Sequence, residues 1–263
     1  MPRTIQNVID TIIAAVPGAP FEDSVDVFKS GDPAQEVTGI ITTFTANMHV
    51  LRKTVALGAN LVITHEPTFY EHREQTDWMA DDPILQAKRE FIAQNKLTIW
   101  RFHDYWHRHQ PDGIVTGMLK ALGWEAYQPS EHWGPLVIPG MTLGALVATL
   151  KTQLAMSSVR VIGELQQPCE RIGLLVGFSG GDQQIRAFHR WNLDVVICGE
   201  TSEWQTCEYV RDAMAMGCNK ALVVIGHANS EEEGMRYLTT WLQPKFAEVP
   251  ITFVAAGDPI TTL

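Results

Sequence analysis

Apolar residues along the chain follow two patterns, helical spacing and short continuous runs of the kind that form buried strands. Several of the helical stretches end at Gly, which is favoured just after a helix. The predicted helices cover residues 5–13, 48–57, 83–94, 112–122, 143–154, 182–191, a segment ending at 217, and 231–242. The predicted strands cover residues 37–43, 60–64, 97–102, 159–162, 172–176, 194–198, 221–225 and 251–254. This alternation predicts an α/β protein.

Two stretches of the chain are similar to one another, which favours two related halves. The segments ALGANLVITHE and RWNLDVVICGE both read as a helix end, a strand and then Glu. Residues 123–140 are rich in Gly, Pro and aromatic residues and are predicted to be the crossing between the halves. We therefore expect two interlinked α/β halves, 1–125 and 126–263, with mixed sheets and helices packed on them. An arrangement in which the last helix and strand pack back on the first half stays open.

Charge and composition narrow the classes of partner. The formal net charge is -10, so the protein has no general electrostatic attraction to nucleic acid or to an anionic membrane. The chain has no apolar run of about 18 residues, and its first residues lack the apolar core of a secretory signal. Its four cysteines show no CxxC spacing and are predicted to be reduced thiols, mostly in the core. We expect a cytoplasmic protein with a small-molecule substrate.

Four of the predicted strands end in the same kind of residue. The residues after them are His65-Glu66, His103-Asp104 with His107, Gly199-Glu200, and Gly226-His227 with Glu231. Because the carboxyl ends of strands gather at one edge of an α/β sheet, we expect these side chains to meet at a common rim. Imidazole and carboxylate together suit first-row divalent metals, and five or more such groups are enough for two ions.

Structural explanations for the same residues stay open at this point. His227 and Glu231 have i,i+4 spacing, which fits a hydrogen bond on one helix face. The stretch 101–109, which holds His103 and His107 between arginines, is also typical of a solvated turn. The glycine turn 177–182 before a helix is compatible with a plain turn or with an anion site, and it lacks a dinucleotide or P-loop fingerprint.

Three segments resemble the Nif-three family of dinuclear-metal-centre proteins, also called YbgI-like. VLRKTVALGANLVITHEPTFY is similar to the family's helix, strand and His-His-Pro stretch. VVICGETSEW is similar to its strand followed by TGE, and VIGHANSEEEGMRYLTTWL is similar to its GHxxSE stretch and helix. The resemblance covers most of the chain, whereas residues 123–176 match in outline.

The resemblance implies a set of metal ligands with two departures from the family pattern. Glu66 stands at the position of the family's second His, and His107 stands at the position of its Asp. The implied set keeps three imidazoles and two carboxylates, which preserves a ligand charge of about -2 facing two dications. Asp104 is the alternative to His107. The implied ligands are His65, Glu66, His107, His227 and Glu231. Because they come from both predicted halves, we expect the metal site to lie between the halves.

The implied activity is that of a metal-dependent hydrolase acting on a nucleotide-like or phosphate-bearing small molecule, with a GTP cyclohydrolase-type reaction among the options. Two divalent ions would lower the pKa of a bound water; Zn, Mn, Fe, Mg and Ni all stay open. Glu200, Asp104 and His103 are candidates for supporting a ligand or transferring a proton. The competing hypothesis is a non-catalytic metal-binding regulator or scaffold. The family resemblance implies a homo-hexameric ring under either hypothesis.

Overall fold

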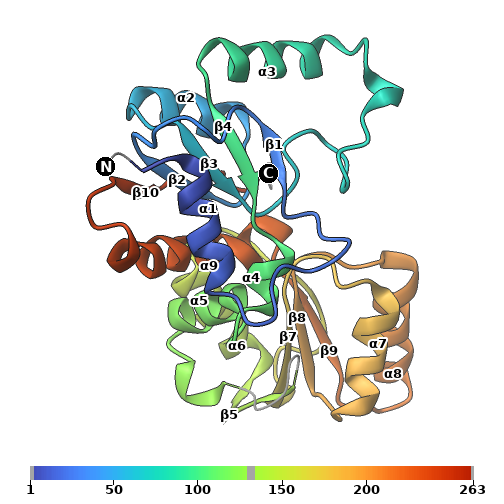
Figure 1. Ribbon diagram of the computed structural model, residues 1–263. Coiled ribbons are helices and arrows are strands. Elements are labelled where there is room, and N and C mark those ends of the chain that lie inside the picture. Colours follow the sequence, from blue (N-terminus) through green and yellow to red (C-terminus); the bar gives the residue numbers. More distant parts are fainter. Residues whose placement is uncertain (1–2, 129–133, 262–263) are drawn as a thin grey trace. The chain divides into compact units, whose positions relative to one another are not determined.

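The computed structural model describes residues 3–128 and 134–261 and confirms the predicted α/β class. Within these residues the strands form two five-stranded sheets (Figure 1). The chain divides into two compact units, one made of Met1–Ile114 with Gly234–Ala256 and the other of Val115–Glu233 with Gly257–Leu263. We describe each unit by itself.

The sheet of unit 1 has the strand order β1-β4-β3-β2-β10. Neighbouring strands from β4 to β10 run parallel, and β1 pairs antiparallel with β4 at one edge. The three inner strands are buried along their whole length, as expected for parallel strands covered on both faces. The strands are β1 (Phe28–Ser30), β2 (Ile40–Thr43), β3 (Leu61–Thr64), β4 (Thr98–Arg101) and β10 (Ile251–Phe253).

The sheet of unit 2 has the order β5-β7-β8-β9-β6. Its centre, β7 to β9, is parallel, and an antiparallel strand pairs at each edge. Phe188 and Val210, from the two helices that follow β7 and β8, pack with Val196 and Leu222 in one apolar cluster. The strands are β5 (Leu136–Thr142), β6 (Arg160–Ile162), β7 (Pro168–Leu175), β8 (Val195–Cys198) and β9 (Ala221–Val224).

The helices begin largely where capping residues stand in the sequence. Thr4, Asn47, Asp82 and Thr142 each accept a hydrogen bond from a backbone N–H of the first turn that follows them. The α-helices are α1 (Ile5–Ala14), α2 (Met48–Ala56), α3 (Pro83–Gln94), α4 (Asp104–Arg108), α5 (Gly113–Leu122), α6 (Leu143–Gln153), α7 (Gly181–Arg190), α8 (Glu208–Ala215) and α9 (His227–Leu242). Short helical turns are η1 (Asp77–Met79), η2 (Glu125–Tyr127), η3 (Glu203–Cys207) and η4 (Gln243–Lys245). None of the helices in the described ranges is long and apolar enough to cross a membrane.

The structure corrects the sequence prediction in several places. It adds β1 and α4, and β5 begins within the stretch 123–140 that the sequence predicts to be a crossing. Residues 129–133 of that stretch lie outside the described ranges. Helix α9 begins at His227, one turn before the predicted start at Glu231. The four strands that end in candidate ligands do not belong to one sheet, because β3 and β4 lie in one sheet and β8 and β9 in the other. That all of their side chains meet stays a prediction.

Candidate metal centre

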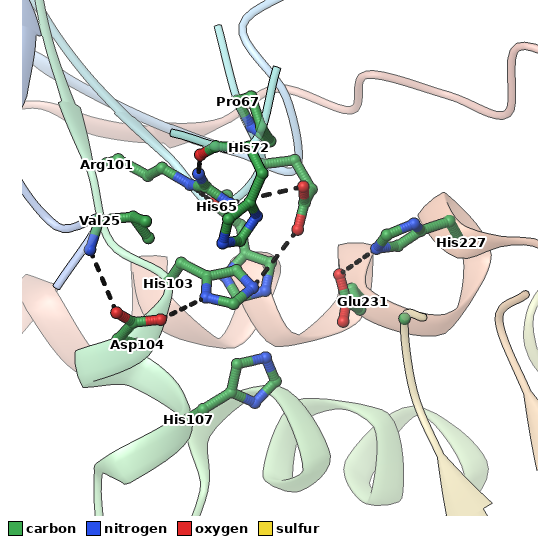
Figure 2. Close-up of polar contacts among 12 residues, drawn as sticks. Val25, His65, Pro67, His72, Arg101, His103, Asp104, His107, His227 and Glu231 are labelled. Atoms are coloured by element: carbon green, nitrogen blue, oxygen red, sulfur yellow. Dashed lines mark hydrogen bonds and ion pairs between the residues drawn. The ribbon is translucent and has the colours of Figure 1, made fainter. Parts of the chain in front are cut away.

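The predicted site residues of unit 1 come together at the carboxyl ends of β3 and β4. These strands are parallel neighbours with Thr64 opposite Arg101, so His65 and His103 follow on adjacent strands. The two imidazole rings are stacked with their centroids 4.5 Å apart. His107, one turn along α4, has its ring centroid 5.0 Å from that of His65 and 5.1 Å from that of His103 (Figure 2). One ligand atom from each of the three residues lies within 4.8 Å of the others.

Each of these three rings is held by a hydrogen bond at Nδ1. His65 Nδ1 lies 3.1 Å from the carbonyl oxygen of Phe102. His103 Nδ1 lies 2.9 Å from Oδ1 of Asp104, and His107 Nδ1 lies 3.0 Å from Oδ2 of Asp112. Imidazoles that ligate metals in proteins are oriented by such contacts from carboxylates and carbonyls.

The start of α4 is fixed by a buried carboxylate that the sequence pattern does not single out. Asp26 accepts the backbone N–H groups of His103, Asp104 and Tyr105 over 2.9, 2.9 and 2.8 Å. Burial raises the pKa of Asp26, while these three hydrogen bonds act in the opposite direction. Asp26 therefore positions the helical turn that carries His103 and His107.

Arg101 fixes the segment that follows β3. Its Nε donates to the carbonyl of His65 over 2.9 Å, and one of its terminal nitrogens donates to the carbonyl of His72 over 2.5 Å. The other terminal nitrogen lies 3.6 Å from Oε2 of Glu66. Arg101 is fully buried, so the interpretation of this stretch as a solvated turn is wrong for this residue. Through these contacts the buried guanidinium fixes the backbone conformation of the segment that carries the His65 and Glu66 side chains.

The protonation of His103 and Asp104 suits a cation site. Burial, together with the neighbouring imidazoles of His65 and His107, lowers the pKa of His103 to about 4, although the Asp104 and Glu66 carboxylates act in the opposite direction. Burial alone would raise the pKa of Asp104, but hydrogen bonds from His103, the Val25 N–H and the Ser24 hydroxyl outweigh it and lower that pKa well below its usual range. At neutral pH His103 is neutral and Asp104 is ionised.

In unit 2, the predicted residues lie at the carboxyl ends of β8 and β9, which are also parallel neighbours. His227 Nδ1 is 2.7 Å from Oε1 of Glu200, and His227 Nε2 is 3.1 Å from Oε2 of Glu231. The hydrogen bond expected from i,i+4 spacing is therefore present, and Glu200 adds a second carboxylate on the other ring nitrogen. Figure 2 shows His227 and Glu231 on the first turn of α9.

Because Gly177 has no side chain, the side chains of His227 and Glu231 can pack directly against its backbone. Its φ is +61°, and a Cβ there would overlap Oε1 of Glu231 and lie 3.2 Å from Nε2 of His227. The backbone of Gly177 also accepts the N–H of Glu200 over 2.9 Å and donates to the Ser230 hydroxyl over 2.9 Å. The loop after β7 thus forms a close cradle around the His227 and Glu231 side chains, which accounts for a Gly at this position.

Both donor sets have the chemistry that divalent metals require. Unit 1 presents three imidazoles and the Glu66 carboxylate, whose Oε1 lies 3.5 Å from Nε2 of His103. Unit 2 presents one imidazole between two carboxylates. Nitrogen and oxygen donors of this kind fit Zn and other first-row ions. Two supporting residues escape sequence reasoning: Asp26 lies on a loop, and Asp112 reads as a helix cap.

One family model and several known proteins match this chain. The model of Duf34/NIF3 (NGG1p interacting factor 3) matches residues 5–259. A relative from Escherichia coli strain K12, the GTP cyclohydrolase 1 type 2 homolog, is 24% identical over 232 residues, which cover 86% of this chain and 87% of the relative. The corresponding homolog of Clostridium perfringens is 24% identical over 215 residues, 76% of each chain.

A solved structure shows the same fold. The crystal structure of a Staphylococcus aureus protein aligns with a TM-score of 0.79 and 18% identity, over 100% of both chains. The family match spans nearly the whole chain, and the relatives and the solved structure cover most or all of it. The chain belongs to the Duf34/NIF3 family.

Proposed function

We propose that this protein binds divalent metal ions and hydrolyses a nucleotide-like or phosphate-bearing small molecule. The observation that carries the proposal is the gathering of three imidazoles at the ends of β3 and β4, each oriented by a hydrogen bond at Nδ1. Imidazoles that ligate metals in proteins are oriented by hydrogen bonds of this kind, and the Glu66 carboxylate lies beside these rings.

The residues expected to hold metal are His65, Glu66 and His107 in unit 1, and His227 and Glu231 in unit 2. That both sets share one pair of ions stays a prediction of the family resemblance. A bound divalent ion would supply a water of lowered pKa and neutralise charge that grows on the substrate.

The chain's own residues orient the ligands and hold the protons. Glu200 accepts from Nδ1 of His227 over 2.7 Å, which leaves Nε2 as the nitrogen that faces Glu231. Asp104 does the same for His103. Because the whole protein carries a formal charge of -10, a phosphate substrate must be held by local positive charge. The names of the relatives, GTP cyclohydrolase 1 type 2 homologs, support a nucleotide as the first substrate class to test.

The test is metal analysis of protein purified without chelator, followed by a hydrolysis screen with nucleotides, cyclic nucleotides and phosphate esters. Glu66→Ala and His227→Ala should each lower both the metal content and the turnover. His189→Ala is the matched control, because His189 is an exposed residue near the end of α7. Bound metal with no turnover of any of these substrates would contradict the hydrolase and favour the regulator or scaffold. Absence of metal from the wild-type protein, even after incubation with Zn²⁺, Mn²⁺ or Fe²⁺, would contradict both.

A further inference from the structure

The hydrogen bonds of unit 1 determine which ring nitrogen of each histidine can bind a metal. A carbonyl oxygen can only accept, so His65 must carry its proton on Nδ1 to bond to Phe102. The carboxylate oxygen of Asp104, 2.9 Å from Nδ1 of His103, accepts as well, so His103 likewise donates from Nδ1. His107 faces the Asp112 carboxylate in the same manner. In a neutral imidazole with the proton on Nδ1, the lone pair is on Nε2. All three rings therefore present the same nitrogen as a ligand.

The three acceptors come from different elements, which makes the common orientation a property of the fold. Phe102 directly follows β4, Asp104 begins α4, and Asp112 precedes α5. Asp104 itself accepts hydrogen bonds from the Ser24 hydroxyl over 3.0 Å and from the Val25 N–H over 3.1 Å. Figure 2 shows the contact with Val25. The side chain of Asp112 is 8% exposed, and that of His107 is 23% exposed. Anchored acceptors of this kind hold imidazoles ready for a metal before it binds.

We infer that unit 1 by itself carries a three-histidine site for a Zn²⁺-class ion, with His65, His103 and His107 as ligands through Nε2. Asp104, Asp112 and the Phe102 carbonyl are the positioning groups. This inference rests on the proposed metal binding. It assigns His103 a different role from the sequence expectation, which treats it as a candidate for supporting a ligand or transferring a proton. Glu66, whose Oε1 is 3.5 Å from His103 Nε2, is the adjacent carboxylate.

The ligand chemistry selects the metal class. Three neutral nitrogen donors suit Zn²⁺, Co²⁺, Ni²⁺ and Cu²⁺, whereas Mg²⁺ and Ca²⁺ require mostly oxygen donors. Three histidines with the fourth position open to water is an arrangement of catalytic zinc sites. We expect unit 1 to bind Zn²⁺ or Co²⁺ in a large excess of Mg²⁺.

The experiment uses the full-length chain with His227→Ala/Glu231→Ala, which removes the ligand set of unit 2. Zn²⁺ affinity is measured by competition with a chromophoric chelator, and Co²⁺ binding by visible absorption, whose intensity reports the number of ligands. We expect this double variant to retain about one ion per chain. His103→Ala in the same background should then weaken Zn²⁺ binding by about 100-fold or more and change the Co²⁺ spectrum. His49→Ala, at an exposed histidine of α2, is the matched control and should change neither.

The positioning role is tested at Asp112 by a graded pair of variants. Asp112→Asn keeps an oxygen that can accept from His107 but removes the charge, and Asp112→Leu removes both. We expect Zn²⁺ affinity to fall by about 10-fold in the first and about 100-fold in the second. The thermal melts of the metal-free proteins check that each variant is folded. Folded variants with equal Zn²⁺ affinity would overturn the positioning role of Asp112.

The outcomes separate this inference from the proposed function. If the double variant loses all metal while the wild type binds it, the self-contained site is refuted and metal binding by the whole protein stands. If His103→Ala leaves the Zn²⁺ affinity and the Co²⁺ spectrum unchanged, His103 is not a ligand. A wild-type protein that binds none of these ions would refute the proposed function, and the inference with it.

Discussion

A substitution of Gly177 by Ala tests the ligand set of unit 2 most sharply, because the added methyl group would displace a ligand side chain without disrupting the fold. In Gly177→Ala the new Cβ would overlap Oε1 of Glu231, which is the far end of a flexible side chain. The carboxylate can therefore move away at little cost in stability, but it then leaves its place beside Nε2 of His227. The variant should lose metal affinity much more than it loses stability.

The expected cost in stability comes from the backbone. Gly177 has a φ of +61°, and an L-residue in the left-handed region costs about 1–2 kcal/mol. Gly217, with a φ of +78° and no atom within 4 Å of an added Cβ, has the same strain and touches no ligand. Gly217→Ala is thus the matched control. For a chain of this size each variant should melt roughly 2–8 °C below the wild type.

The metal affinities should separate the two variants. Displacing a ligand or its immediate support typically weakens metal binding about 10–100-fold. Isothermal titration with Zn²⁺ and with Mn²⁺ should show this loss for Gly177→Ala, and wild-type affinity for Gly217→Ala. Equal metal affinities in the two variants, at comparable melting temperatures, would refute the assignment of Glu231 and His227 as ligands.

Three further predictions follow from the described contacts. Lys88 is 3% exposed and burial lowers its pKa to about 8, so it binds fewer protons in the folded than in the unfolded state between pH 8 and 10.5. In urea titrations the unfolding free energy of the wild type, relative to that of Lys88→Met, should therefore rise by about 3 kcal/mol across this pH range. Relative to Lys53→Met, a control at an exposed lysine, it should show no such rise. Asp26→Asn should lower the unfolding free energy by about 2–3 kcal/mol and weaken Zn²⁺ binding, because an amide nitrogen cannot accept hydrogen bonds from the backbone N–H groups at the start of α4. Asp81→Asn, at an exposed site, should change both quantities little. An unaltered Zn²⁺ affinity in Asp26→Asn would count against the positioning role of Asp26. Light scattering should give six times the chain mass of 29.4 kDa if the protein forms the hexamer that the family resemblance implies, and a monomer mass would contradict it.

The elements that sequence patterns predict well are those with long or fully apolar signals. The predicted helix 83–94 agrees with α3 at both ends, because Asp82 is a capping residue and Pro83 suits the first helical position. The buried strands β3, β8 and β9 also lie where continuous apolar runs predict them. Local patterns were sufficient for these elements because their residues carry the signal themselves.

The elements that the sequence pattern misses depend on distant partners. Helix α4 has five residues, too few to be stable alone, and its first N–H groups are bound by Asp26, which is far away in the sequence. Strand β1 has three half-buried residues at a sheet edge, and β5 contains Pro and Gly with exposed positions. Edge strands of this kind lack the continuous apolar run that identifies a buried strand.

For the candidate site, the kinds of residue and their strand-end positions were predictable, but their grouping was not. Strand pairing divides them between two sheets, with His65 and His103 in unit 1 and Glu200 and His227 in unit 2. Arg101 is a charged residue that sequence alone would place at the surface. Its guanidinium can be buried because the backbone carbonyls of His65 and His72 accept its hydrogen bonds. Such pairings depend on the tertiary fold, and periodicity along the chain contains no information about them.

The most direct test of the central claim is anomalous diffraction at the zinc absorption edge, from crystals of the wild-type protein grown with Zn²⁺ and excess Mg²⁺. We predict a strong anomalous peak within bonding distance of the Nε2 atoms of His65, His103 and His107. Ordered imidazoles with no peak between them, or a peak bound at surface residues instead, would contradict the claim that the fold of unit 1 holds a metal.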